Sequence, residues 1–237
     1  MFRKYAGLSI VYMLVCCMIV ILALCGSRLV TNLSENAVIY NRTCIIIDAG
    51  HGGVDGGATS CTGILESKIN LDIALKLEDI CHLFGFKTKM IRDTDISVYT
   101  EGATIAAKKV SDLKQRVKIA NETKNAILIS IHQNYFNESK YFGAQLFYAK
   151  TQGSAELANH IQNNIKHYLA RDNTRQPKYA DGVYLMQQIK CTGVLIECGF
   201  ISNPEEEARL RDDKYQKRLC CVIGATLSNY LDPVEIG

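Results

Sequence analysis

The chain alternates short apolar runs with longer segments in which apolar residues recur every three or four positions. The short runs predict strands, and the three- or four-residue spacing predicts amphipathic helices. Strands are predicted at residues 44–48, 87–91, 126–131, 144–149, 182–186 and 194–198. Helices are predicted at residues 66–84, 111–123, 154–169 and 215–230, and one more begins after Asn203. This alternation predicts an α/β domain with a twisted, mostly parallel sheet flanked by helices on both faces.

Individual residues mark several helix ends. Gly85 follows the first predicted helix at the position of a capping glycine. Asn203 and Pro204, followed by three glutamates, are typical of a helix N-terminus. The long polar segment 92–110 is predicted to cover a cleft. Ser111 is predicted to cap the helix that follows it, with Leu113, Val117 and Ala120 facing the core.

The N-terminal segment differs from the rest of the chain. Residues 6–26 are apolar and uncharged, and Arg3 and Lys4 precede them. This length suffices for a helix that crosses a bilayer, and the basic residues place the N-terminus in the cytoplasm. We therefore predict a single-pass membrane anchor at residues 1–27, a tether at 28–42 and an exported catalytic domain at 43–237. A cleaved signal peptide is the alternative, although its apolar core is usually shorter.

Charge and cysteine content narrow the functional classes. The chain has 27 Lys and Arg residues against 24 Asp and Glu residues, and two of the basic residues precede the apolar stretch. The exported part is therefore nearly neutral, and nucleic acid is not an expected partner. Seven of the ten cysteines follow the anchor, without a C-x-x-C spacing. Most lie among apolar residues and are predicted to be buried free thiols, with disulfides as the alternative.

Four polar residues stand out because each lies at the end of a predicted element. His51 follows the first strand within a glycine-rich turn, Glu66 begins a helix, His132 follows a strand, and Glu197 lies near the end of another. Ligand sites in open α/β sheets gather at the carboxyl ends of the strands. Two histidines and one glutamate match a catalytic zinc site, with the second glutamate acting on water. A phosphate-binding loop is a weak alternative, because neither glycine-rich nucleotide motif fits.

Other polar residues near these positions are candidates for supporting roles. Asp48 and Asn134 flank the histidines and could orient metal ligands, as metal sites usually require. Arg92 and Arg116 are predicted either to contact the substrate or to stabilise the fold. Glu197 lies within an apolar strand, where an unpaired carboxylate would cost several kcal/mol, so a role at the site accounts for it.

Four motifs carry a resemblance to a known family. They are residues 48–53 (DAGHGG), Glu66, residues 130–134 (SIHQN) and residues 197–203 (ECGFISN), with L-x-x-R at 113–116 in support. In this order they resemble the zinc-dependent N-acetylmuramoyl-L-alanine amidases of the amidase-3 type, over residues 44–232. The resemblance implies that His51, Glu66 and His132 hold Zn²⁺ and that Glu197 is catalytic. The implied substrate is peptidoglycan, cut between the lactyl group of N-acetylmuramic acid and L-alanine.

The layout of one anchor and one catalytic domain resembles the CwlD-like germination-specific group of this family. That likeness implies the spore cortex as substrate, muramic-δ-lactam formation as the outcome, and a location at the cell envelope or forespore intermembrane space. Gln133 departs from the family pattern, which usually has a small residue there, and is predicted to narrow the site. Residues 93–110 are too few for the autoinhibitory insertion of some division amidases, so an envelope activator protein is a possible partner.

Three alternatives to this function remain at the level of sequence. Another envelope zinc hydrolase, such as a peptidase or a sugar deacetylase, could use the same ligands. A membrane-tethered peptidoglycan-binding scaffold would not need His51, Glu66, His132 and Glu197 to be intact. A serine hydrolase is disfavoured, because no G-x-S-x-G motif occurs.

Overall fold

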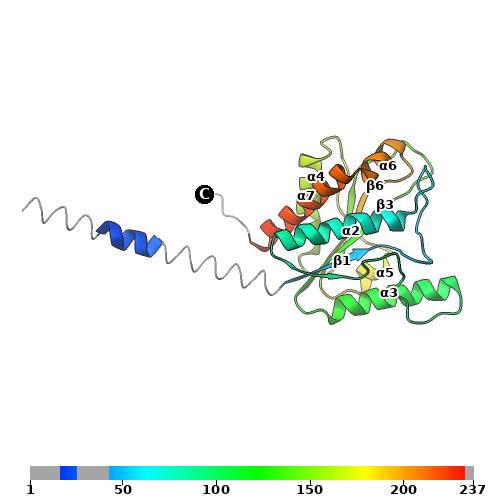
Figure 1. Cartoon of the computed structure of the whole chain (residues 1–237), viewed down its shortest axis with the longest axis horizontal. Helices are drawn as coiled ribbons and strands as arrows, with labels where there is room; N and C mark the ends of the chain where they lie inside the picture. The colour runs from blue at the N-terminus through cyan, green and yellow to red at the C-terminus, as the bar shows by residue number, and fades with distance from the viewer. Residues whose placement is uncertain (1–16, 26–42, 233–237) are drawn as a thin grey trace, which may run out of the picture. The chain divides into compact units, whose positions relative to one another are not determined.

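The computed structural model describes residues 17–25 and 43–232, which belong to two separate units with a boundary after Tyr40 (Figure 1). In the first unit, residues 17–25 form a helical segment. Among the described residues, no helix is long and apolar enough to cross a membrane. Most of the predicted anchor and the whole predicted tether lie outside the described residues, so both stay predictions.

The second unit is built on a six-stranded sheet in the order β2-β1-β3-β6-β4-β5. The four strands β2, β1, β3 and β6 are parallel, whereas β4 runs antiparallel to β6, and β5 runs parallel to β4. The strands are β1 (Cys44–Ala49), β2 (Lys87–Met90), β3 (Ala126–Asn134), β4 (Gln145–Tyr148), β5 (Lys178–Tyr179) and β6 (Thr192–Phe200). The predicted mostly parallel α/β sheet is confirmed.

Helices cover both faces of this sheet, and Figure 1 shows the two layers. Helices α2 (Glu66–Leu83), α4 (Ser154–Tyr168) and α7 (Asp213–Leu231) pack together on one face, with α6 (Pro204–Arg211) beside α7. Helices α3 (Ile105–Glu122) and α5 (Tyr184–Gln188) lie on the other face. There they pack on alternate strand residues, which include Ile46, Leu128 and Leu195. Because side chains alternate along a strand, Asp48, Ser130, His132 and Glu197 share that face.

Helix α3 corrects one sequence prediction. It begins at Ile105 rather than at Ser111, and the Thr104 side chain caps it by accepting from the backbone N–H of Ala107 at 3.2 Å. Ser111 is a residue within α3 and does not cap it. Its hydroxyl accepts from the N–H groups of Thr100 and Glu101. The first turns carry few buried apolar residues, so periodicity could not detect them. They form because alanine and lysine favour a helix.

Residues 182–186 also differ from the prediction. They were predicted to be a strand, but α5 occupies Tyr184–Gln188, and the sequence prediction missed the two-residue strand β5. Leu185, Met186 and Ile189 all enter the core, which a helix permits and an alternating strand does not. The predicted cap at the start of α6 is confirmed, since the Asn203 side chain accepts from the N–H groups of Glu205 and Glu206.

The cysteines of the second unit are free thiols in the structure. Cys81, Cys198 and Cys220 are buried, which confirms the buried-thiol prediction for Cys81 and Cys220. Cys221 was also predicted to be buried, but it is exposed on α7. Neighbouring residues on a helix point in different directions, so one of two adjacent cysteines faces the solvent.

Candidate active site

Glycines allow the loop after β1 to approach the neighbouring side chains closely. A Cβ atom on Gly50 would lie 2.2 Å from Nε2 of His132, and one on Gly57 would lie 2.6 Å from Oε2 of Glu66. His51 itself adopts a positive φ of 60°, which is uncommon for a residue with a side chain. The glycine-rich run therefore provides the close backbone approach that the sequence indicated.

His51, Glu66 and His132 meet at one point, although they come from a loop, a helix and a strand. Their ligand atoms all lie within 4.8 Å of one another. Nε2 of His51 is 3.3 Å from Oε2 of Glu66, and Nδ1 of His132 is 3.0 Å from Oε1 of the same carboxylate. The two imidazole rings meet edge to face, with centroids 5.0 Å apart. The structure thus gathers the three predicted metal ligands.

Three more donors hold the Glu66 carboxylate, from the loop before α2, from β3 and from α2 itself. Oε2 accepts from the N–H of Ala58 at 3.1 Å, and Oε1 accepts from the N–H of Gln133 at 3.1 Å and from Nδ2 of Asn70 at 3.2 Å. Burial would raise the pKa of Glu66, but hydrogen bonds and charge from His132 and His51 hold it well below its usual range. Glu66 is therefore an anion at any pH near neutrality.

Asn70 and Gln133 form a buried link behind the cluster. Asn70 also donates from Nδ2 to the carbonyl of Gly50 at 3.1 Å, and its Oδ1 accepts from Nε2 of Gln133 at 3.1 Å. The prediction that Gln133 narrows the site is wrong, because its side chain points to the α2 face and is buried there. Asn70 was missed as a site residue, although its position four residues after Glu66 was a signal: the two share one helix face.

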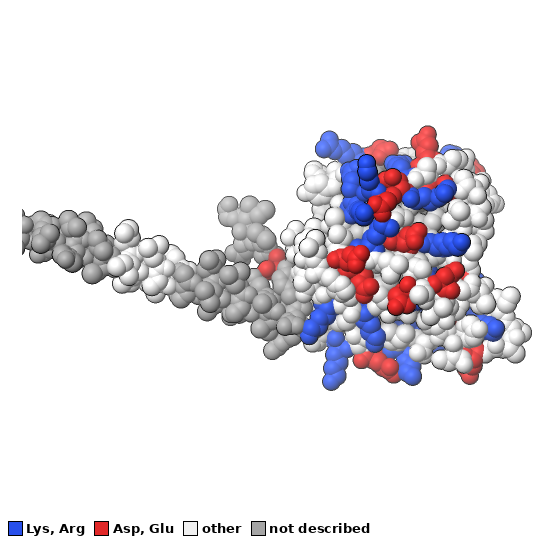
Figure 2. All heavy atoms as spheres, in the orientation of Figure 1, with Lys and Arg blue, Asp and Glu red and all other residues white. Residues whose placement is uncertain are grey.

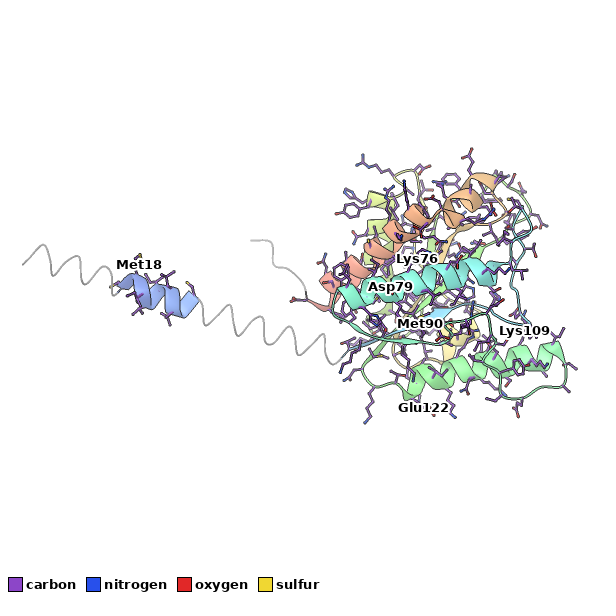
Figure 3. The ribbon with its side chains drawn as sticks, in the orientation of Figure 1. Met18, Lys76, Asp79, Met90, Lys109 and Glu122 are labelled. Atoms are coloured by element: carbon purple, nitrogen blue, oxygen red, sulfur yellow. The ribbon has the colours of Figure 1, made fainter. Side chains whose placement is uncertain are left out.

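Asp55 orients His51 from the opposite side. Its Oδ2 lies 2.9 Å from Nδ1 of His51, and its Oδ1 pairs with Nζ of Lys109 at 2.9 Å; Figure 3 labels Lys109 on α3. Burial would lower the pKa of His51, but Glu66 and Asp55 outweigh it and raise the pKa to about 9. A carboxylate on the second ring nitrogen is the usual support of a metal-binding histidine.

Glu197 lies directly beside His132 in the parallel register of β3 and β6. Its Oε2 is buried and has no hydrogen-bond partner among the described residues. Burial raises the pKa of Glu197 to about 7; the charge of Glu66 adds to the shift, while His132 and His51 oppose it. This carboxyl group can therefore exchange a proton near neutral pH.

The two arginines singled out from the sequence support the loop backbone. Arg92 is 2% exposed and donates to the carbonyls of Ala49, Gly50, Ser67 and Thr94. All three of its nitrogens are engaged with backbone, so Arg92 stabilises the fold and does not face the cleft. Arg116 donates to the carbonyl of His51 at 2.7 Å and to that of Ala49 at 3.0 Å.

Asp48 and Asn134 also take supporting positions. Asp48 accepts from Arg116 and from the Ser130 hydroxyl, the latter at 2.6 Å. Burial would raise the pKa of Asp48, but the charge of Arg116 outweighs it, with help from His132 and Ser130, and lowers the pKa. The carbonyl of Asn134 accepts from the N–H of Ile201 at 2.9 Å, next to an irregularity in the β3–β6 register.

A cleft between α3 and α5 opens onto the cluster. Its volume is about 340 Å³, within the range of small-molecule sites. His51, His132, Asp48 and Arg116 line it together with apolar and charged side chains of the two helices. Leu113 lines this cleft and is exposed, which corrects the prediction that it faces the core.

The donor set fits a zinc ion. Two imidazoles and one carboxylate are the protein ligands of many catalytic zinc sites, which keep a fourth position open. The loop glycines leave space beside these ligands, and a buried glutamate oxygen without a partner lies next to them. The fold and site together define an α/β protein with the metal-binding chemistry of a hydrolase.

Comparison with known proteins agrees with this class. The family model for N-acetylmuramoyl-L-alanine amidase matches residues 45–229, and the chain belongs to this family. It is 36% identical to the germination-specific N-acetylmuramoyl-L-alanine amidase of Bacillus subtilis, over 81% of this chain and 82% of that protein.

Solved structures extend the likeness. The CwlD amidase of Clostridioides difficile, in complex with the GerS lipoprotein, is 40% identical with a TM-score of 0.76, over 81% of this chain and 98% of that one. An N-acetylmuramoyl-L-alanine amidase from Clostridium difficile 630 is 30% identical with a TM-score of 0.70, over 82% and 99% of the two chains. The chain is therefore an enzyme, a hydrolase of the N-acetylmuramoyl-L-alanine amidase family that acts on peptidoglycan.

Proposed function

We propose that this enzyme is a zinc-dependent amidase that cuts the bond between the lactyl group of N-acetylmuramic acid and L-alanine. His51, Glu66 and His132 hold the zinc ion, and Glu197 is the catalytic acid–base. One observation carries the proposal: the three donor groups converge within 4.8 Å, and Glu197 pairs in register with one of them while keeping a buried oxygen without a partner among the described residues.

The residues divide the reaction between them. Bound zinc would supply positive charge that acidifies water and polarises the amide carbonyl. The Glu197 carboxylate takes a proton from water as the water oxygen bonds to the lactyl carbonyl carbon. When the C–N bond breaks, Glu197 returns the proton to the departing nitrogen of L-alanine. Its pKa of about 7 suits both directions of transfer.

The surroundings of the cluster position the substrate and the ligands. The cleft between α3 and α5 accepts the stem peptide, because it begins at His51 and His132 and its apolar lining includes Leu113 and Tyr184. Asp55 keeps Nδ1 of His51 occupied, so that Nε2 faces the metal. Arg116 fixes the backbone on both sides of Gly50 through the carbonyls of Ala49 and His51.

The physiological substrate in this proposal is spore cortex peptidoglycan. Support comes from the likeness to a germination-specific amidase and to the CwlD amidase. Removal of stem peptides there prepares muramic-δ-lactam formation. A partner belongs to the proposal too, because the solved CwlD amidase is in complex with a lipoprotein. We infer an envelope lipoprotein as activator, and an exported catalytic domain tethered by the predicted N-terminal anchor.

Mass spectrometry of digested peptidoglycan tests this function. The zinc-loaded protein, with and without a candidate lipoprotein partner, is incubated with purified cortex and with vegetative peptidoglycan. We expect free stem peptides that begin with L-alanine and muramic acid without a peptide, formed faster from cortex. Cuts within the stem peptide, or loss of acetyl groups, would contradict the assigned bond. Equal rates on both walls would contradict the cortex assignment alone.

A further inference from the structure

The loop between β3 and β4, residues 135–144, presents aromatic side chains to the solvent. Tyr135, Phe136 and Phe142 are 47%, 48% and 43% exposed. We call these three side chains the aromatic platform. Exposed aromatic side chains on one loop suggest a binding surface, and the site described above does not use these residues.

Contacts beneath the platform hold this loop in place. The Phe136 ring packs edge to face on Tyr141 at a centroid distance of 4.7 Å, and Tyr141 stacks at 6.2 Å on Phe200, which is buried. The Asn203 side chain donates to the carbonyls of Ser139 and Tyr141. The loop is therefore anchored to the end of β6 and the start of α6, and the Phe136 ring is held against it through Tyr141.

Strand register places the platform at the edge of the sheet that carries the site. The loop leaves β3 at Asn134, two residues after His132, and it enters β4 at Gln145, which pairs directly with Glu197. An open pocket of about 300 Å³ adjoins it, lined by Lys140, Tyr141, Phe142, Asn173, Thr174 and Arg175. Arg175 is fixed there by the carbonyl of Phe142 and by Oε1 of Gln145.

We propose that the aromatic platform binds the glycan strand of the polymer, on the sugars that adjoin the disaccharide with the scissile bond. This inference rests on the proposed function, since the amide that is cut joins the peptide directly to a sugar of that strand. Sugar rings have apolar C–H faces that pack on aromatic rings, while the Tyr135 hydroxyl can bond to their polar groups. The adjoining Arg175 suits the acetamido and carboxyl oxygens of such a strand.

The position of the platform, together with its composition, favours a sugar over a protein, because Tyr135 follows His132 by three residues and the proposed bond that is cut there is attached to a sugar. Its three exposed side chains are all aromatic, whereas the exposed large apolar residues of the segment from Ile96 to Val110 are aliphatic. Flat rings match the flat faces of sugars. The stem peptide then occupies the cleft between α3 and α5, and the glycan occupies the opposite side of the cluster.

Binding to glycan chains tests this assignment without any need for turnover. The full-length chain with Glu197→Gln is sedimented with insoluble peptidoglycan, and its affinity for soluble glycan chains freed of stem peptides is measured by calorimetry. Adding Tyr135→Ala and Phe142→Ala should weaken both interactions at least about fivefold, because the loss of even one ring contact of ordinary strength has that effect. Leu83→Ala is the matched control, because Leu83 is 81% exposed at the last turn of α2, far from Glu66 at its first turn.

Turnover separates this inference from the proposed function. With Glu197 intact, the double variant should raise KM on polymer about fivefold and leave kcat/KM on a soluble disaccharide-peptide within twofold. Unchanged affinity of the double variant for glycan chains would overturn the glycan-binding role of the platform. The same role would be overturned if the double variant lost affinity only for a purified lipoprotein partner. Failure of the unmodified enzyme to cut the disaccharide-peptide would refute the function, while the binding result would still stand. Tyr135→Phe keeps the ring and loses only the hydroxyl, so it should bind glycan more tightly than Tyr135→Ala does.

Discussion

Two glutamates in the same site have opposite surroundings. Glu66, on the α2 side, accepts hydrogen bonds from the backbone of Ala58 and Gln133 and from the side chain of Asn70. Glu197, on the α3 and α5 side, has a buried oxygen without a partner among the described residues. The pKa of Glu66 is held far below its usual range, whereas burial raises that of Glu197 to about 7.

This difference shows how one residue type serves two roles. A carboxylate that accepts several hydrogen bonds and is always ionised suits the role of metal ligand, because protons do not compete with the metal for its oxygens. A carboxyl group that is deprived of donors suits proton transfer near neutrality. Site residues whose environments push their pKa values apart can thus be assigned roles from the structure, and three substitutions test the assignment.

The largest effect is expected at Glu197. Glu197→Gln keeps the size of the side chain but removes the proton acceptor, so kcat should fall about 10³-fold. Zinc content, measured by inductively coupled plasma mass spectrometry, should stay at one ion per chain. His51→Ala is the contrasting variant, since it removes a ligand and should lose the zinc. Loss of zinc from Glu197→Gln would show that Glu197 is a ligand and that the two roles are wrongly assigned.

Asp48 is a third carboxylate, on the same face as Glu197 but paired with Arg116. Breaking a buried ion pair by removing one partner is costly, so Asp48→Asn should lower the free energy of unfolding at pH 7 by about 3 kcal/mol. Urea denaturation measures this loss. Asp213→Asn is the control, because Asp213 is an exposed partner of Lys217 and its loss should leave stability essentially unchanged.

The same pair gives stability a defined pH dependence. The pKa of Asp48 is lower in the folded state than in the unfolded chain, so the folded state binds the proton less readily. The contribution is therefore complete above the unfolded pKa of about 3.9 and is lost as the pH falls through the folded pKa. The difference between wild type and Asp48→Asn should shrink below about pH 4. An equal difference at pH 7 and pH 3 would show that packing, not charge, accounts for the loss.

A smaller effect is expected at Asn70. Asn70→Ala removes the donor to Glu66 and the link to Gln133, which should weaken zinc binding about tenfold, as losses around metal ligands usually do. Competition with a chromophoric chelator measures the affinity, and the cobalt-substituted absorption spectrum reports a changed ligand geometry. Asn159→Ala, at an exposed position of α4, is the matched control. Unchanged affinity and spectrum would show that the backbone donors alone hold Glu66.

The sequence predicted the strands that carry the site better than the segments that surround it. β1, β3 and β6 contain continuous apolar runs, so the strands that carry His132 and Glu197 and the turn that carries His51 could be recognised. The strand ends were predicted less well: β3 extends to Asn134 and β6 to Phe200, so His132 lies within its strand rather than after it. The start of α3 and the whole of α5 could not be predicted correctly, because the apolar residues Ile105 and Val110 of α3 are exposed and α5 is too short to show a helical period. Their boundaries depend on packing against the sheet rather than on local pattern.

Arg92 and Gln133 show a second limit. Both were recognised as polar residues near the site, but their direction was not readable from the chain. The Arg92 side chain donates to backbone carbonyls of the loop after β1. The Gln133 side chain lies on the opposite face of β3 from His132. A strand pattern indicates which residues alternate, whereas the elements packed on each face decide what each side chain contacts.

The sequence by itself determined the α/β class, the family motifs and the four residues His51, Glu66, His132 and Glu197. Each of these follows from local chemistry: apolar runs, glycines and donor types in a recognisable order. Only the tertiary structure decided that Glu66 is surrounded by donors, that a buried oxygen of Glu197 has no partner among the described residues, and that exposed aromatic residues follow β3. Those properties depend on groups that are distant in sequence and on which of them reach a buried atom. Burial and hydrogen bonding are set by three-dimensional packing, and they assign different roles to identical side chains.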